Sequence, residues 1–212
     1  MSELPQHEAA ARDALHERFP EAAALLDAYV EILGTKGLEW GLLGPREGDK
    51  LWSRHVANSL ALNDVIANGL DVADIGSGAG LPGLPLAIAR PDLRITLVEP
   101  LLRRATFLEE TVEELGLGDR VVVRRARAEE LKATFDVVTA RAVTALDKLV
   151  RWTSHLFLPH GALVALKGSS AQREVFEAGS RLTKAKLSAE VLEIRAAAGI
   201  EGTFSIRVSR ER

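Results

Sequence analysis

The sequence of 212 residues contains no cysteine, which excludes disulfides, thiolate metal sites, iron–sulfur clusters and cysteine nucleophiles. Its five histidines show no HExxH or comparable ligand spacing, so we expect no metal centre. No apolar run approaches the roughly 20 residues of a membrane span, and no basic stretch followed by an apolar one marks a signal peptide. These absences predict a cytoplasmic protein without metal or membrane association.

The first third of the chain has the pattern of a helical cap. Apolar residues recur at helical spacing, with a break at Phe19-Pro20 and a later loop rich in glycine and charge. The expected helices span residues 7–18, 21–34 and 51–68. We therefore predict an N-terminal helical cap over residues 1–68 and a second domain over residues 69–212.

In the second domain, short apolar strands alternate with helices. Strands are expected at residues 71–76, 94–99, 120–127, 135–142, 161–167, 187–195 and 203–209. Helices are expected at residues 84–89, 101–115, 144–156 and 171–184. This alternation predicts a mostly parallel sheet with helices on both faces, and a short glycine turn makes the last strand antiparallel. An α/β, Rossmann-like sheet of seven strands with an antiparallel last strand is the architecture of class I S-adenosylmethionine-dependent methyltransferases.

The segment DIGSGAGLPG, residues 74–83, places three alternating glycines after the first expected strand. A Walker phosphate loop is excluded because no Lys-Ser/Thr pair follows the glycines. A dinucleotide fingerprint needs its first glycine directly after the strand; counted from Gly76, its third position is Leu81 instead of glycine. The preceding Asp74 suits a positively charged adenosyl sulfonium better than a pyrophosphate. A dinucleotide site and a purely structural loop stay open as alternatives.

Two further strand ends carry groups suited to S-adenosylmethionine. Glu99 ends the second expected strand, where a carboxylate can accept two hydrogen bonds from ribose hydroxyls. After the third strand, Glu129 beside Ala128 can meet the adenine amino group. Because parallel strands end at one edge of a sheet, we expect one donor site there. The expected donor-binding residues are Asp74, Gly76, Gly78, Gly80, Glu99, Ala128 and Glu129.

Several motifs lie at fixed spacing between residues 50 and 170. They are RHVANSL at 54–60, DIGSGAGLPGLPLAIARPDLRITLVEP at 74–100, RRATFLEE at 103–110, RAEEL at 127–131, TARAV at 139–143 and ALKG at 165–168. With these motifs the chain resembles the ribosomal RNA small-subunit methyltransferase G family, also called glucose-inhibited division protein B. The chain departs from the family pattern at Asn58, where an acid is common, and in EWGLLGPRE at 39–47.

The resemblance implies transfer of a methyl group from S-adenosylmethionine to N7 of one guanine in the helix 18 loop of 16S ribosomal RNA. It also implies that this RNA, or the small ribosomal subunit, is the partner. Carried over position by position, the family's cofactor contacts fall on Gly76, Leu81, Ala128, Glu129 and Arg141.

The expected chemistry needs no general base. Guanine N7 carries an available lone pair, so its methylation requires positioning and electrostatics and no proton removal. The chain has TARAV in place of the Asn/Asp-Pro-Pro-aromatic motif of exocyclic-amine methylases, and it lacks the cysteine of pyrimidine C5 methylases. Arg141 and Lys167 end strands at the ligand edge, where we expect them to position guanine O6 or a phosphate.

Positive charge is concentrated locally, although the formal net charge is −3. The span RVVVRRAR at 120–127 holds four arginines and no acid, but strand alternation lets only half of them share a face. The residues that we expect to contact RNA are Arg54, His55, Arg103, Arg104, Arg124 and Arg125. The acidic net charge keeps a small-molecule methyltransferase open, and a non-catalytic ribosome-assembly factor that binds the cofactor is a third hypothesis.

Overall fold

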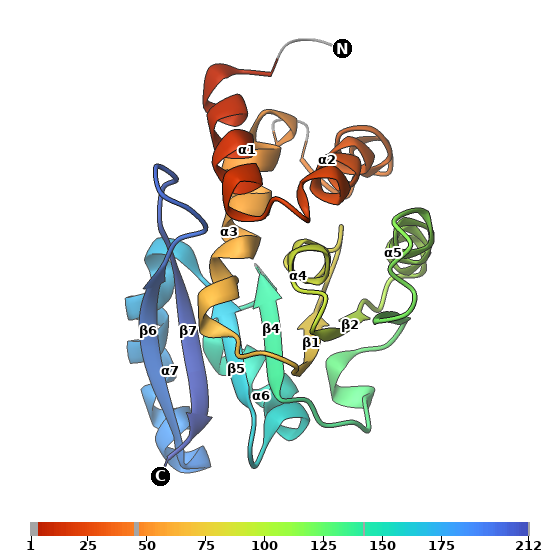
Figure 1. The fold of residues 1–212 in the computed structure, drawn as a ribbon. Helices are drawn as coiled ribbons and strands as arrows, with labels where there is room; N and C mark the ends of the chain where they lie inside the picture. The colour runs from red at the N-terminus through yellow and green to blue at the C-terminus, as the bar shows by residue number, and fades with distance from the viewer. Residues whose placement is uncertain (1–3, 45–46, 142, 212) are drawn as a thin grey trace.

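The computed structural model describes residues 4–44, 47–141 and 143–211 and forms a seven-stranded sheet covered by helices (Figure 1). The strands are β1 (Asp71–Ile75), β2 (Arg94–Val98), β3 (Val121–Arg124), β4 (Val137–Arg141), β5 (Ala162–Leu166), β6 (Leu187–Ile194) and β7 (Thr203–Arg210). Their order is β3-β2-β1-β4-β5-β7-β6, and β7 runs antiparallel to both neighbours. The predicted mostly parallel sheet with an antiparallel last strand is therefore confirmed.

Strand β1 lies at the point where the order of the strands along the sheet reverses. It pairs in parallel with β2 on one side and with β4 on the other. The chain therefore leaves β1 and β4 toward opposite faces, and open α/β sheets bind ligands in the crevice outside the carboxyl ends at such a point. The glycine loop that follows β1 lies at this crevice.

Helices cover both faces of the sheet. They are α4 (Gly83–Ala89), α5 (Leu102–Glu114), α6 (Leu146–Phe157) and α7 (Ala171–Ala185). One apolar cluster joins α4 and α5 to the cap and includes Leu26, Trp52, Leu60, Leu84 and Phe107. A second cluster packs α6 and α7 on the sheet and includes Leu149, Phe157, Leu163 and Leu182. Because the first cluster is continuous, the cap is anchored to the sheet by burial of apolar surface. The domain boundary at residue 68 stays a prediction.

The cap is helical but less regular than the spacing predicts. It consists of α1 (Gln6–Arg18), α2 (Ala23–Ile32), η1 (Leu33–Gly37), η2 (Gly48–Lys50), η3 (Leu51–Val56), α3 (Ala57–Leu60) and η4 (Ala61–Val65). The predicted end of the second helix at residue 34 was wrong, because a π-helical turn continues through η1 to Gly37. Leu33 is fully buried there, and this packing outweighs the low helix propensity of two glycines.

The third cap helix also differs from the expectation of a regular helix over 51–68. It begins as a π-helix in η3 and ends as a 3-10 helix in η4, so Val65 is its last helical residue. At its start, the buried carboxylate of Glu8 accepts hydrogen bonds from the backbone N–H groups of Trp52 (2.7 Å) and Ser53 (2.9 Å). The Glu8 side chain, which comes from α1, thereby satisfies two of the backbone N–H groups that the start of a helix leaves without partners.

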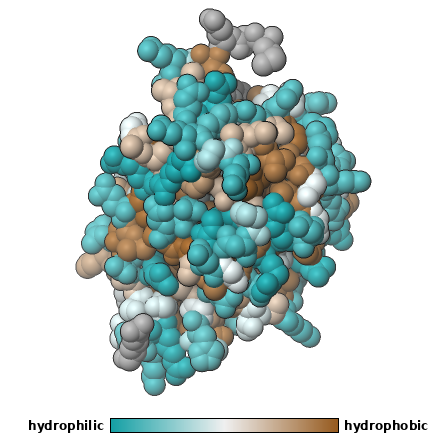
Figure 2. All heavy atoms as spheres, viewed as in Figure 1, coloured by the Kyte–Doolittle hydropathy of each residue, from teal (hydrophilic) through white to brown (hydrophobic). Residues whose placement is uncertain are grey.

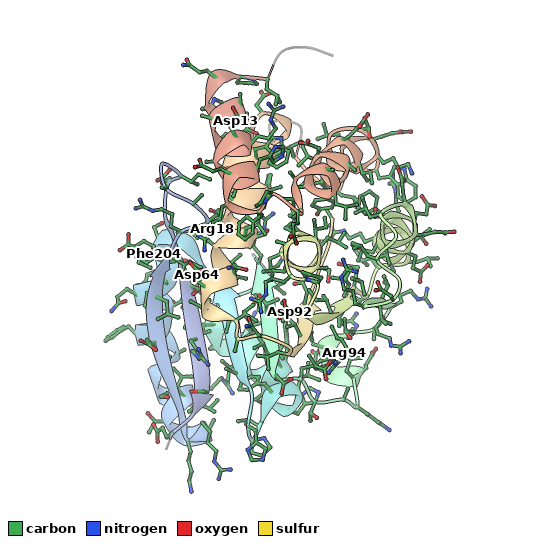
Figure 3. The ribbon with its side chains drawn as sticks, viewed as in Figure 1. Asp13, Arg18, Asp64, Asp92, Arg94 and Phe204 are labelled. Carbon is green, nitrogen blue, oxygen red and sulfur yellow. The ribbon has the colours of Figure 1, made fainter. Side chains whose placement is uncertain are left out.

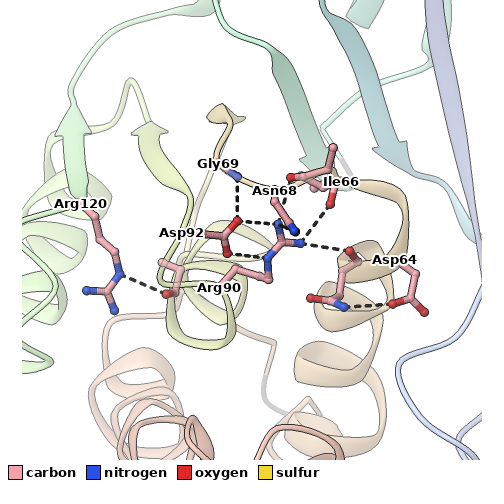
Figure 4. Close-up of polar contacts among 10 residues, drawn as sticks. Asp64, Ile66, Asn68, Gly69, Arg90, Asp92 and Arg120 are labelled. Atoms are coloured by element: carbon pink, nitrogen blue, oxygen red, sulfur yellow. Dashed lines mark hydrogen bonds and ion pairs between the residues drawn. The ribbon is translucent and has the colours of Figure 1, made fainter.

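Arg90 closes the other end of this helix (Figure 4). Its guanidinium donates to the carbonyls of Asn63 (3.2 Å), Ile66 (3.0 Å) and Ala67 (2.9 Å), and pairs with Asp92 at 2.7 Å. The hydrogen bonds from Arg90 hold the pKa of Asp92 well below its usual range. These hydrogen bonds join the end of the third cap helix to the end of α4.

The molecular surface is mainly polar. Figure 2 shows hydrophilic side chains over most of one face, with smaller hydrophobic areas between them.

A second arginine, Arg18, links α1 to the cap's last turn by an ion pair with Asp64 at 2.5 Å (Figure 3). The helix predicted over 101–115 begins one residue later, and Leu101, which precedes it, is 54% exposed. Within the described ranges no helix is long and apolar enough to cross a membrane.

Candidate functional site

The glycine loop after β1 has a backbone that only glycine adopts without strain. Gly76, Gly78 and Gly80 have φ of +69°, +58° and +95°. A Cβ on Gly80 would lie 2.3 Å from Leu84 Cδ1, whereas a Cβ on Gly78 would meet only the Gly76 carbonyl at 3.8 Å. Gly78 therefore leaves open space on the loop, as close approach of a ligand requires.

Asp74 lies fully buried beneath this loop. Its Oδ2 accepts a hydrogen bond from the Gly83 N–H at 3.1 Å, and its Oδ1 has no hydrogen-bond partner among the described residues. Burial raises the pKa of Asp74 from 3.8 to about 7. This placement favours a role in holding the start of α4 against the loop, and direct contact with a donor stays a prediction.

Glu99, at the end of β2, ties two segments of the site together. Its Oε2 accepts from the Gly78 N–H at 3.1 Å and its Oε1 from the Leu101 N–H at 3.0 Å. The side chain is 2% exposed. Each carboxylate oxygen has a second lone pair, so ribose hydroxyls and these backbone donors can be accepted together.

A tyrosine from the cap reaches the same loop, and the sequence analysis placed no function on it. The Tyr29 hydroxyl donates to the Ala79 carbonyl at 2.8 Å, from α2 to the centre of the glycine loop. Burial raises the pKa of Tyr29 well above its usual value, so the hydroxyl keeps its proton. Its only sequence signal was a place on the apolar stripe of α2, which does not reveal a polar partner.

Arg141 ends β4 and meets the cap in a largely buried polar chain. Its Nη2 lies 2.8 Å from His55 Nδ1, and His55 Nε2 lies 2.7 Å from Glu47 Oε2. Burial, and next the charge of Arg141, lower the pKa of His55 from 6.5 to about 4. Burial also lowers the pKa of Arg141 from its ordinary value. His55 is 5% exposed, which does not favour the predicted RNA contact.

Lys167, the second predicted positioning residue, is already engaged within the protein. Its Nζ lies 2.8 Å from Glu174 Oε2 and also donates to the Thr144 carbonyl. The side chain is largely buried, and Glu174 in turn accepts from the Leu146 N–H at 2.9 Å. These contacts favour a role in joining β5, α6 and α7 over substrate positioning.

Ala128 and Glu129, which we predicted beside the adenine, lie in the turn after β3. Ala128 is buried and Glu129 is exposed at the start of a short 3-10 helix, η5 (Ala128–Glu130). Leu81, carried over from the resemblance, is buried in the glycine loop. Strand β3 ends at Arg124, earlier than the predicted residue 127, because the chain turns there toward η5.

The arginines that we predicted to contact RNA differ in exposure and in their contacts within the protein. Arg124 and Arg125 are exposed at the end of β3, and Arg104 is half-buried on α5. Arg103 is exposed and lies over the Trp40 ring at 5.7 Å. Arg54, with a side chain 56% exposed, lies 3.3 Å from Glu47. The arginines of α5 and β3 therefore lie on the β2–β3 side of the crevice, and Arg54 lies on the cap side.

A cavity of about 690 Å³ lies between the cap and the carboxyl ends of β4 and β5. Its lining includes Arg54, His55, Asn58, Arg141, Val143 and Lys167. A neighbouring cavity of about 840 Å³, between α1, η3 and the loop before β7, shares Arg54 and Asn58 with it. The described residues contain no group of three metal-ligating side chains.

The sheet order, the reversed β7, the glycine loop after β1 and the acid after β2 define a class I methyltransferase fold. A putative O-methyltransferase from Klebsiella pneumoniae superposes with a TM-score of 0.64 at 15% identity, covering 99% of this chain and 100% of that one. The ribosomal protein L11 methylase from Lactobacillus delbrueckii subsp. bulgaricus gives a TM-score of 0.54 at 16% identity, covering 73% and 77%. At such identities the likeness shows the fold alone.

Sequence comparison is more specific. The family model described as rRNA small subunit methyltransferase G matches residues 22–199. The chain is 52% identical over 188 residues to Ribosomal RNA small subunit methyltransferase G of Nocardioides sp., covering 87% of this chain and 75% of the relative. It is 49% identical over 202 residues to the same protein of Kineococcus radiotolerans, covering 93% and 79%. The chain therefore belongs to the rRNA small subunit methyltransferase G family.

Proposed function

We propose that this protein transfers a methyl group from S-adenosylmethionine to N7 of a guanine in 16S ribosomal RNA. The observation that carries the proposal is the family match over residues 22–199, which includes the glycine loop, Glu99 and Arg141. We further propose that this guanine lies in the helix 18 loop, as the resemblance implies, and that the reaction takes place in the cytoplasm.

The crevice beside β1 fits the methyl donor. S-adenosylmethionine supplies an electrophilic methyl carbon when bound. Gly76, Gly78 and Gly80 would let the backbone approach it, while Glu99 would accept its ribose hydroxyls. The turn at Ala128 and Glu129 would meet the adenine, as the resemblance implies. The open space above Gly78 agrees with a ligand at this loop.

The cavity at the ends of β4 and β5 would receive the guanine. Arg141 lines it and would hold either the donor's carboxylate or guanine O6, because a guanidinium offers several fixed donors. The N7 lone pair attacks without losing a proton, so the protein's work is alignment, and neither a general base nor a metal ion is required. The adjoining cavity that shares Arg54 would continue the path of the RNA strand.

The test is incubation with labelled S-adenosylmethionine and small ribosomal subunits that lack N7 methylation. We expect label at one guanine N7, and we expect Arg141→Ala to reduce its rate strongly. Naked 16S RNA and a panel of small-molecule acceptors run in parallel. If calorimetry confirms donor binding and no label enters RNA, the proposal is wrong; label in small acceptors alone would favour a small-molecule methyltransferase.

A further inference from the structure

The contact between Arg141 and the cap is unusual for a guanidinium that is mostly buried. Within the described ranges, no carboxylate oxygen lies within 4 Å of an Arg141 guanidinium nitrogen, and the guanidinium instead contacts the ring of His55. Buried arginines are ordinarily paired with acids. Here a neutral imidazole takes the place of the acid, which leaves the positive charge of Arg141 free for a ligand.

The surroundings of the imidazole set its tautomer. A guanidinium only donates, so the 2.8 Å contact requires an unprotonated Nδ1 with its lone pair toward Arg141. Glu47 Oε2, 2.7 Å from Nε2, disfavours a lone pair there and favours an N–H. This approach has the distance but not the direction of a hydrogen bond, so the effect of Glu47 is mainly electrostatic.

The charged groups around the pair act in opposing senses, and their balance sets the charge of each member. Asp74 from β1 and Glu47 from the loop before η2 stabilise the Arg141 cation, and Arg54 from η3 opposes it. Burial and then the charge of Arg141 disfavour a proton on His55, whereas Glu47 favours one and only partly offsets them. On balance Arg141 stays charged and His55 stays neutral at neutral pH.

We propose that His55 is a positioning residue whose Nδ1 lone pair orients the Arg141 guanidinium toward the ligand crevice, with Glu47 selecting the tautomer. The role rests on the proposed function for its ligand, and of the two groups named there it takes the donor's carboxylate and not guanine O6. The His55–Arg141 bond itself does not rest on that function. The arrangement couples the cap to the end of β4 across 86 residues of sequence. It gives the RHVANSL motif a function within the site in place of the predicted RNA contact.

Two isosteric substitutions separate this role from simple packing. The side-chain amide of asparagine superposes on the Nδ1 side of an imidazole, and that of glutamine on the Nε2 side. His55→Asn therefore keeps an acceptor for Arg141, whereas His55→Gln loses it although it fills more of the volume. We expect His55→Gln to weaken donor binding by about tenfold or more, as loss of a charge-assisted hydrogen bond implies, and His55→Asn to stay within about threefold.

Donor dissociation constants come from calorimetry, with thermal unfolding as the check that both variants fold. A second readout needs no ligand: ¹⁵N spectra of histidine-labelled protein at pH 7 should show His55 protonated at Nε2 and unprotonated at Nδ1. Arg141→Met should then shift the Nδ1 resonance, because its hydrogen-bond donor is gone.

The outcomes are distinct. If wild-type protein binds no donor, the proposed function fails, while the spectra still decide whether Nδ1 accepts a bond from Arg141. If the wild type binds donor and His55→Gln binds it equally well, the positioning role is overturned. An Nδ1–H tautomer, or a His55 spectrum indifferent to Arg141→Met, overturns it as well, even where both His55 variants fail to fold.

Discussion

Asp74 makes the stability of the ligand-free protein depend on pH in an unusual direction. Burial raises its folded-state pKa to about 7, against 3.8 in the unfolded chain. Between these values the unfolded state loses its proton while the folded state keeps it, so the unfolded state binds fewer protons. The free energy of unfolding therefore falls as pH rises from about 4 to 7.

The size of the effect follows from the pKa difference. A difference of about three pH units corresponds to at most about 4 kcal/mol of lost stability at pH 8. Asp74→Asn keeps an acceptor for the Gly83 N–H and cannot ionise. We expect it to match the wild type near pH 4 and to be more stable at pH 8 by up to that amount.

The assay is urea unfolding of wild type and Asp74→Asn at several values between pH 4 and pH 8. Asp119→Asn, which removes a carboxylate with a side chain 72% exposed, is the matched control and should follow the wild type. The argument fails if Asp74→Asn shows the same pH slope as the wild type, or if it is less stable than the wild type at pH 8.

Three further predictions concern the loop and its supports. Gly83→Ala should destabilise the fold by several kcal/mol, because its Cβ would lie 2.4 Å from Leu97 Cδ2. Gly78→Ala has open space around its Cβ but a φ of +58°, so it should cost about 1–2 kcal/mol. Thermal unfolding compares the two variants, and equal losses of stability would contradict the prediction. Arg90→Ala should cost about 2–4 kcal/mol in urea unfolding, since it leaves the partly buried carbonyls of Asn63 and Ile66 without this donor. Removing Arg94, whose ion pair with Asp71 is exposed, should cost less than about 1 kcal/mol, and an equal loss for the two variants would contradict the prediction. Glu99→Gln should lower the free energy of unfolding by about 1–2 kcal/mol, because an amide accepts through only one of the two atoms to which the Gly78 and Leu101 N–H groups donate. It should also weaken donor binding measured by calorimetry. Unchanged stability would refute the anchoring role of Glu99.

Much of the fold follows from local patterns. Apolar runs and helical spacing place six of the seven strands within two residues of their observed ends, and β3 ended early because its polar arginines continue into a turn. The positions of Asp74, the alternating glycines and Glu99 at strand ends are equally local, since a parallel sheet brings successive carboxyl ends to one edge. Hydrophobic period and turn residues are properties of short segments, so they can be read along the chain.

Side-chain partners are a different matter, because only the tertiary structure brings distant segments together. Lys167 and Arg141 both end strands, yet Glu174 neutralises Lys167 while Arg141 meets a neutral His55. Nothing in the spacing of RHVANSL separates a surface histidine from one buried against β4. The sequence by itself determined the alternation of strands and helices and the loop that faces the ligand. Packing of the cap on the sheet decided which charges stay free at that loop, since ion pairs depend on distances through space and not along the chain.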